Sequence, residues 1–110
     1  MDNINRIAYG LRSGLYTTNP HGCAEDLAIL AGEYAFIMGQ LEAILQRKPD
    51  IWQQLRPSLK SDTSCERAWE STKDGLNEAA LRLRAKTVEK MMSALKSLIR
   101  IAESESHNLL

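Results

Sequence analysis

The chain is poor in the residues that build disulfide frameworks and active sites. It has only two cysteines and two histidines. Cys23 and Cys65 lie far apart in the sequence, so no disulfide framework is expected. The first ten residues lack a charged segment followed by an apolar core, so we expect no signal peptide. Two thiols in a chain without such a signal predict a reduced, cytoplasmic protein.

Other absences exclude further classes of function. No apolar run approaches the roughly 18 residues of a membrane span, so no membrane association is expected. The only other nitrogen and sulfur ligands, His21 and His107, form no zinc pattern with the cysteines. There is no glycine-rich phosphate loop and no Ser/His/Asp arrangement. We therefore expect no enzyme, no catalytic residues, no metal and no cofactor.

Apolar residues at helical spacing predict an all-α fold in which residues 1–110 form one domain. Residues 1–16 read as a helical arm, and 17–22 as a turn around Asn-Pro. Segment 23–60 holds a helix that ends before Pro49 and then a short helix. A capping box of Thr63 and Glu66 opens one very long helix over 63–106. We expect the two segments to pack as an antiparallel helical hairpin, with a polar end at which Leu109 and Leu110 could dock.

The helix over 23–47 has two apolar sides. One is a seam with 3,4,3,4,3 spacing, formed by Leu27, Leu30, Tyr34, Ile37, Leu41 and Ile44. The other is a stripe of small residues, formed by Ala28, Gly32, Ala35, Gly39 and Ala43. Small side chains allow a second helix to approach closely, so the stripe predicts an interface in a homo-oligomeric helical bundle. A tolerant face within a single bundle remains the alternative.

The long helix changes charge along its length. Its first third is acidic, and a basic band follows, formed by Arg82, Lys86, Lys90, Lys96 and Arg100. Such a row can follow a phosphate backbone, although a solvated helix face would have the same composition. Glu89 lies inside the band, within reach of Lys86 or Lys90. Gly75 stands where the sign changes, which favours a kink or a short break there.

Further residues of the long helix suggest packing. Its apolar side is broad and includes Leu76 and Leu83, which favours contact with more than one neighbour. Arg84 points toward that side and reads as an interface residue paired with an acid, either Glu33 or one from another subunit. The carboxylates at i,i+4 spacing read as a solvated acidic face. Trp52 and Trp69 read as core residues, with base stacking as the alternative.

The run from Tyr34 to Asn108, which includes YAFIMGQLEAILQRKPDIWQQLRPSLKSD and a lysine-rich final helix, resembles small helical proteins of phages and mobile elements. Among functional families it is similar to the UvsY-like recombination mediators. That resemblance rests on helix order and length, and implies an oligomeric protein that binds single-stranded DNA and a recombination partner. A helical protein-interaction module, either an adaptor or an inhibitor of a host defence enzyme, is the alternative.

Overall fold

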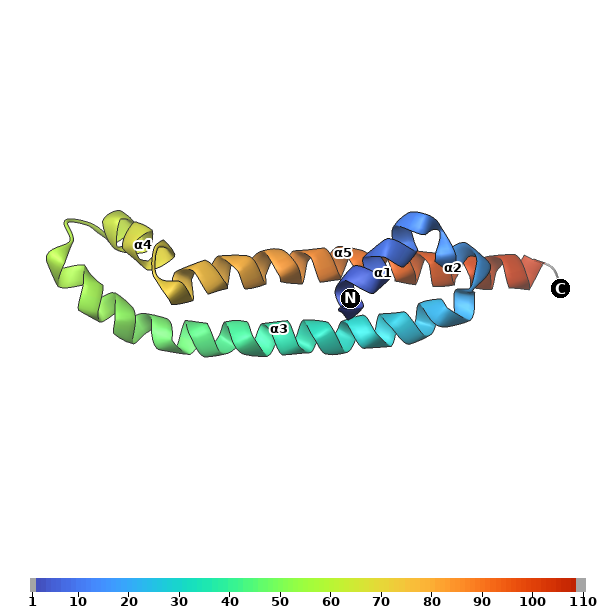
Figure 1. The fold of residues 1–110 in the computed structure, drawn as a ribbon, viewed down its shortest axis with the longest axis horizontal. Coiled ribbons are helices and arrows are strands. Elements are labelled where there is room, and N and C mark those ends of the chain that lie inside the picture. Colours follow the sequence, from blue (N-terminus) through green and yellow to red (C-terminus); the bar gives the residue numbers. More distant parts are fainter. Residues whose placement is uncertain (1, 109–110) are drawn as a thin grey trace. The chain divides into compact units, whose positions relative to one another are not determined.

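The computed structural model describes residues 2–108, with side chains up to residue 106, and every regular element in that range is helical (Figure 1). The elements are α1 (Asn3–Ser13), α2 (Leu15–Thr18), α3 (Pro20–Leu55), the 3-10 turn η1 (Arg56–Ser58), α4 (Asp62–Glu70) and α5 (Lys73–Asn108). The all-α prediction is confirmed for this range. Leu109 and Leu110, which we expected to dock, lie outside the described residues.

The chain divides into two compact units, each with its own core. Unit 1 combines the described parts of 1–35 and 86–110, and unit 2 is 36–85. The core of unit 1 contains Ile4, Ile7, Tyr16, Cys23, Leu30, Val88, Met91 and Leu95. The core of unit 2 contains Ile37, Leu41, Ile44, Cys65, Trp69 and Ala85. Four of the six residues predicted for the seam of α3 are therefore buried, and Leu27 and Tyr34 are half-buried.

In unit 1, α1 is capped at both ends. The Asp2 carboxylate accepts a hydrogen bond from the Asn5 backbone N–H at 2.8 Å. Gly14 ends the helix with a φ of 75°, in the left-handed region that glycine adopts without steric cost. Ile4 and Ile7 are buried, and the Asn3 amide donates to Glu33 on α3 at 3.2 Å. The predicted arm is thus helical and docked within its own unit.

The turn predicted over 17–22 is wrong in extent, because α3 begins at Pro20. Proline suits the first helical position, where its missing N–H has no partner to lose. The Asn19 side chain accepts from the Gly22 N–H at 3.1 Å, as a capping residue does. The Asn-Pro pair therefore starts a helix here.

Within unit 1 the beginning of α3 runs antiparallel to the end of α5. The Cys23 thiol donates to the Leu95 carbonyl at 3.4 Å, and the Tyr34 hydroxyl donates to Glu89 at 2.6 Å. Moving forward along α3 therefore means moving backward along α5. This pairing places one face of α5 toward solvent, and that face carries the basic residues.

The predicted helix end before Pro49 is wrong, because α3 continues through it to Leu55. Proline inside a helix removes one backbone hydrogen bond and costs roughly 3 kcal/mol. The two side chains that precede Pro49 bind acidic residues of α4 and α5. Arg47 donates two hydrogen bonds to Asp74, and Lys48 lies 3.4 Å from Glu66 and 3.8 Å from Glu78. Such tertiary contacts offset the local preference for a break.

The single long helix predicted over 63–106 is two helices. Ser61, not Thr63, caps α4 by accepting from the Ser64 N–H at 3.1 Å. The chain breaks at Ser71 and Thr72, and the Thr72 hydroxyl accepts from the Gly75 N–H at 3.0 Å to start α5. Gly75 itself is buried, and a Cβ there would clash with the Trp69 carbonyl oxygen. Glycine is required because the end of α4 presses on the first turn of α5.

Two predicted core positions of α5 face solvent instead. Leu76 is 61% exposed and Leu83 is 69% exposed. The apolar side of α5 is therefore wider than the surface that its own chain covers.

By length and composition, α3 contains a stretch that is apolar enough to cross a membrane, and 22% of that stretch is buried. Core helices of soluble proteins pass the same test.

Candidate nucleic-acid interface

Four of the five predicted phosphate-binding residues lie on the unit 1 part of α5, and all four are exposed. They are Lys86, Lys90, Lys96 and Arg100. Among the side chains of residues 2–106, none of the four forms an ion pair. Along the helix axis the four residues span about 21 Å. Lys86 and Lys90 are about 6 Å apart along this axis, and so are Lys96 and Arg100. Their positive charge is therefore presented to solvent as a row.

The acid within this row, Glu89, is hydrogen-bonded to a residue of another helix. Glu89 accepts a hydrogen bond of 2.6 Å from the Tyr34 hydroxyl on α3. That hydrogen bond raises the pKa of Tyr34, because the carboxylate favours the protonated phenol. The sequence offered Lys86 and Lys90 as partners for Glu89. Tyr34 was missed because it belongs to the apolar seam of a helix 55 residues away in sequence.

Arg82, the fifth predicted residue, lies in unit 2 and is paired. Its Nε donates to Glu78 Oε2 at 2.9 Å, one turn earlier on α5. Burial raises the pKa of Glu78, but hydrogen bonds from Trp69 and Arg82 outweigh it and hold that pKa below its usual range. Arg82 thus presents a partly neutralised charge, unlike the four cations of unit 1.

Of the four carboxylates expected to form a solvated face, Glu70 is exposed, whereas Glu66, Asp74 and Glu78 bind basic residues of α3. Asp74 takes two hydrogen bonds from Arg47, which lower the pKa of Asp74. Lys48 lies between two carboxylates and two indoles, 5.8 Å from the ring centre of Trp52 and 5.2 Å from that of Trp69. Cation–π and ionic contacts therefore tie the three helices of unit 2 together.

The core interpretation of the tryptophans is confirmed for Trp69 and only in part for Trp52. Trp69 is 1% exposed and its indole N–H donates to Glu78 at 2.8 Å. Trp52 is half-buried beside Lys48. Trp69 is too deeply buried to stack on a base, whereas Trp52 keeps part of its surface exposed.

A buried polar cluster in unit 1 was not anticipated. Asp26, 8% exposed, accepts two hydrogen bonds from Arg6 at 3.2 and 2.8 Å and one from the Tyr16 hydroxyl at 2.6 Å. The hydrogen bonds from Arg6 are the main cause of the lowered pKa of Asp26. Burial is the main cause of the raised pKa of Tyr16. The sequence places Asp26 on the apolar seam side of α3, between Cys23 and Leu30. That position could have indicated a buried carboxylate. This cluster fastens α1 and α2 to α3.

The predicted interface stripe is open to solvent. Every member is exposed, and an added Cβ at Gly32 or Gly39 would meet nothing within 4 Å. The stripe consists of Ala28, Gly32, Ala35, Gly39 and Ala43. Arg84, also assigned to an interface, is exposed on α5, while Glu33, one of its suggested partners, accepts from Asn3. Nothing in the described chain covers the stripe.

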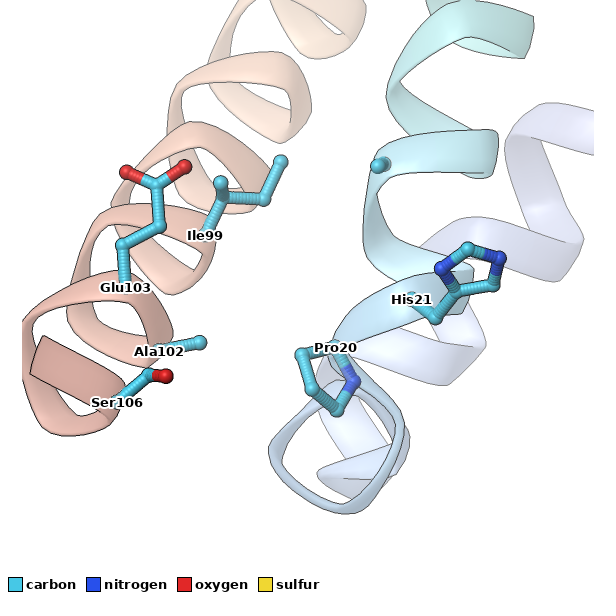
Figure 2. Close-up of a pocket in the computed structure, with 7 residues that line it drawn as sticks. Pro20, His21, Ile99, Ala102, Glu103 and Ser106 are labelled. Carbon is cyan, nitrogen blue, oxygen red and sulfur yellow. The ribbon is translucent and has the colours of Figure 1, made fainter. Parts of the chain in front are cut away.

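Unit 1 also contains an open apolar groove of about 530 Å³ between the start of α3 and the end of α5 (Figure 2). Pro20, His21 and Ala24 form one wall, and Ile99, Ala102, Glu103 and Ser106 form the other. His21 lies 3.7 Å from Glu25 on its own helix. None of the four exposed cations lines the groove.

Among the described residues, no group of three or more His, Cys, Asp and Glu side chains is placed to hold a metal ion. Both cysteines are free and buried, and burial raises the pKa of the Cys23 thiol. No known protein family, no curated protein and no solved structure matches this chain.

Proposed function

We propose that this chain is a non-enzymatic accessory protein of phage type that binds single-stranded nucleic acid through α5 and acts beside a recombination partner. The observation that carries the proposal is the row of four exposed, unneutralised cations in unit 1. The resemblance to UvsY-like mediators supports the choice of single strands and of a recombination partner. The binding residues are Lys86, Lys90, Lys96 and Arg100, with Arg82 at the edge of the row.

The mechanism is neutralisation of phosphates. Each bound phosphate releases condensed counterions, so affinity falls steeply as salt rises. Four contacts on a single strand correspond to a slope of about −3 in a plot of log K against log salt. Phosphate contacts carry no base information, so a protein that binds through them follows the backbone and tolerates any base sequence.

Charge reversal tests this proposal directly. Lys86→Glu combined with Lys96→Glu is compared with Arg67→Glu combined with Lys73→Glu, which makes the same charge change at exposed positions of unit 2. Binding of a labelled single-stranded oligonucleotide is followed by fluorescence anisotropy at about 50 mM salt. We expect the first pair to abolish binding and the second to weaken it less than threefold. No binding by the unmodified protein, or equal losses in both pairs, would refute the proposal.

We also propose that the chain self-associates, with α3 and α5 as the arms of an antiparallel hairpin in each copy. The exposed apolar surface supports this, since Phe36 on α3 and Leu83 on α5 are 66% and 69% exposed. Apolar faces of this kind mark interfaces in soluble proteins. Light scattering after size exclusion tests it, and a particle of 12.3 kDa at all concentrations would contradict it.

The same surface favours a second candidate function, a helical protein-interaction module that does not bind nucleic acid. In that case the apolar face of α3 would hold a different protein, and the charge reversals on α5 would change nothing. Retained binding of a purified partner after Lys86→Glu with Lys96→Glu, together with no oligonucleotide binding, would favour this candidate.

A further inference from the structure

The α5 wall of the apolar groove in unit 1 is flanked by two opposite charges. Ile99 and Ala102 form the apolar part of that wall, and their side chains point into the space between the two walls (Figure 2). Lys96 lies three residues before Ile99, and Glu103 lies four residues after it. The two charged positions are about 10 Å apart along the axis and within about 20° of each other around the helix. One side of α5 therefore carries a positive charge, an apolar centre and a negative charge in that order.

Both of these charges face solvent. Lys96 and Glu103 are exposed, and Ile99 between them is only half-buried. Over residues 2–106, whose side chains the structure describes, neither Lys96 nor Glu103 forms an ion pair. A surface that covers this side of the groove should carry the complementary order, which is a negative charge, an apolar centre and a positive charge.

The same helix of a second copy has this order when it runs in the opposite direction. A two-fold axis midway between residues 99 and 100 brings Lys96 opposite Glu103 of the partner subunit. The axis forms this ion pair twice, and Ile99 packs against Ile99 of the partner subunit between the two pairs. Such a contact is self-complementary and closes as a dimer. In a parallel pair, Lys96 would instead face Lys96 of the partner subunit.

We propose that the apolar groove of unit 1 is covered by α5 of a second copy, in an antiparallel contact that pairs Lys96 with Glu103 of the partner subunit. The complementary charges of one helix side select both the occupant and its direction. All residues of the contact belong to unit 1. The contact rests on the self-association proposed above, and it adds a place and an orientation.

This contact also bears on the basic row of α5. Lys96 is one of the four residues proposed to bind phosphates, so a second copy and a nucleic acid compete for its charge. Binding at the two places is therefore linked, and each should weaken the other to the same extent. Self-association through this edge thus lowers the charge that the row presents.

Charge reversal with rescue tests the contact. Lys96→Glu and Glu103→Lys each place like charges at both ion pairs, so we expect each variant alone to dissociate about tenfold more readily than the unmodified protein. In an equimolar mixture the two variants meet with opposite charges at both pairs. The mixture should therefore regain the association of the unmodified protein to within about threefold. Light scattering over a concentration series at about 50 mM salt gives these values.

Glu105→Lys is the matched control. It makes the same charge change two residues further along α5, at an exposed position about 160° away around the helix. We expect this variant to associate as the unmodified protein does. Glu103→Lys leaves every proposed phosphate-binding residue in place, so it should bind a single-stranded oligonucleotide at least as tightly as the unmodified protein while it loses self-association.

Each other outcome has a distinct meaning. Dimers that persist in both single variants would overturn this contact and leave self-association in place. Tighter association of Lys96→Glu with the unmodified protein than of the unmodified protein with itself would overturn the antiparallel direction. A monomer at all concentrations would overturn both this contact and self-association. Loss of oligonucleotide binding in Glu103→Lys would contradict the competition for Lys96.

Discussion

The Tyr34 hydroxyl donates a hydrogen bond to Glu89 across the two main helices of unit 1, with 2.6 Å between the oxygens. This contact has two consequences. It joins α3 to α5, and it keeps the carboxylate of Glu89 from pairing with Lys86, which lies about one turn earlier on α5. A seam residue of one helix therefore shapes the charge presented by the other.

Removing that hydroxyl is expected to weaken nucleic-acid binding without touching a cation. In Tyr34→Phe, Glu89 is free to pair with Lys86, so we expect oligonucleotide affinity to fall about threefold. The free energy of unfolding should fall by about 1 kcal/mol with the lost hydrogen bond. Fluorescence anisotropy and urea denaturation measure the two effects. Tyr9→Phe, at a residue 62% exposed, is the matched control and should change neither.

The corner between α4 and α5 should not tolerate a side chain at Gly75. Alanine would gain roughly 1 kcal/mol of helix propensity at an unconstrained site. Here its Cβ would clash with the backbone of Trp69, so we expect a net loss of about 2 kcal/mol from overpacking. Urea denaturation followed by circular dichroism gives the value. Gly32→Ala, where the space is open, should not destabilise the fold, and equal effects of the two changes would contradict the close approach.

Pro49 offers a test of whether α3 is continuous. If the helix runs through this position, Pro49→Ala restores a backbone hydrogen bond and raises the free energy of unfolding by up to about 3 kcal/mol. If a new helix began there, proline would be well placed and its loss would be neutral or unfavourable. Thermal unfolding of the two proteins decides, and an unchanged midpoint would support a break.

The Asp26 cluster predicts a specific dependence of stability on pH. The pKa of Asp26 is lowered in the folded state, chiefly by the Arg6 hydrogen bonds, so its ionised form is stabilised by folding. That contribution is fully present above the unfolded pKa of about 3.9, and is lost as pH falls through the lower folded value. Asp26→Asn should cost about 2 kcal/mol at pH 7.

The difference between Asp26→Asn and the unmodified protein should shrink below about pH 4, as the native carboxyl becomes protonated. Urea denaturation at a series of pH values measures it. Asp50→Asn, at an exposed carboxylate, serves as control and should give a small difference at every pH. A pH-independent difference for Asp26→Asn would show that shape, not charge, is responsible.

Helical periodicity was sufficient to predict the class of the fold and most of the seam of α3, because burial of apolar residues imposes that spacing. Helix ends were harder. Pro49 and the Asn19-Pro20 pair are breakers in isolation, yet the first is held inside a helix by contacts of unit 2 and the second starts one. The sequence predicted a break at Gly75, but the chain breaks at Ser71 and Thr72. Glycine is needed at position 75 because α4 approaches α5 closely there, and not for a bend.

The candidate interface was predictable only in part. Sequence spacing placed Lys86, Lys90, Lys96 and Arg100 on one face, and that face is exposed. The spacing did not show which basic residues form ion pairs within the chain. Arg47 and Lys48, for example, are basic residues of α3 that bind acids of α4 and α5. Partners from distant helices depend on how the helices pack, and short-range patterns do not contain that information.

Both tryptophans of the chain, Trp52 and Trp69, belong to unit 2, and their ring centres lie 5.8 and 5.2 Å from the Lys48 ammonium. Their intrinsic emission therefore reports on that unit alone, whereas far-ultraviolet dichroism reports on the helices of both. If the two signals follow the same denaturation curve, the units melt as a single cooperative block. Separate curves would give each unit its own stability from a single unlabelled sample.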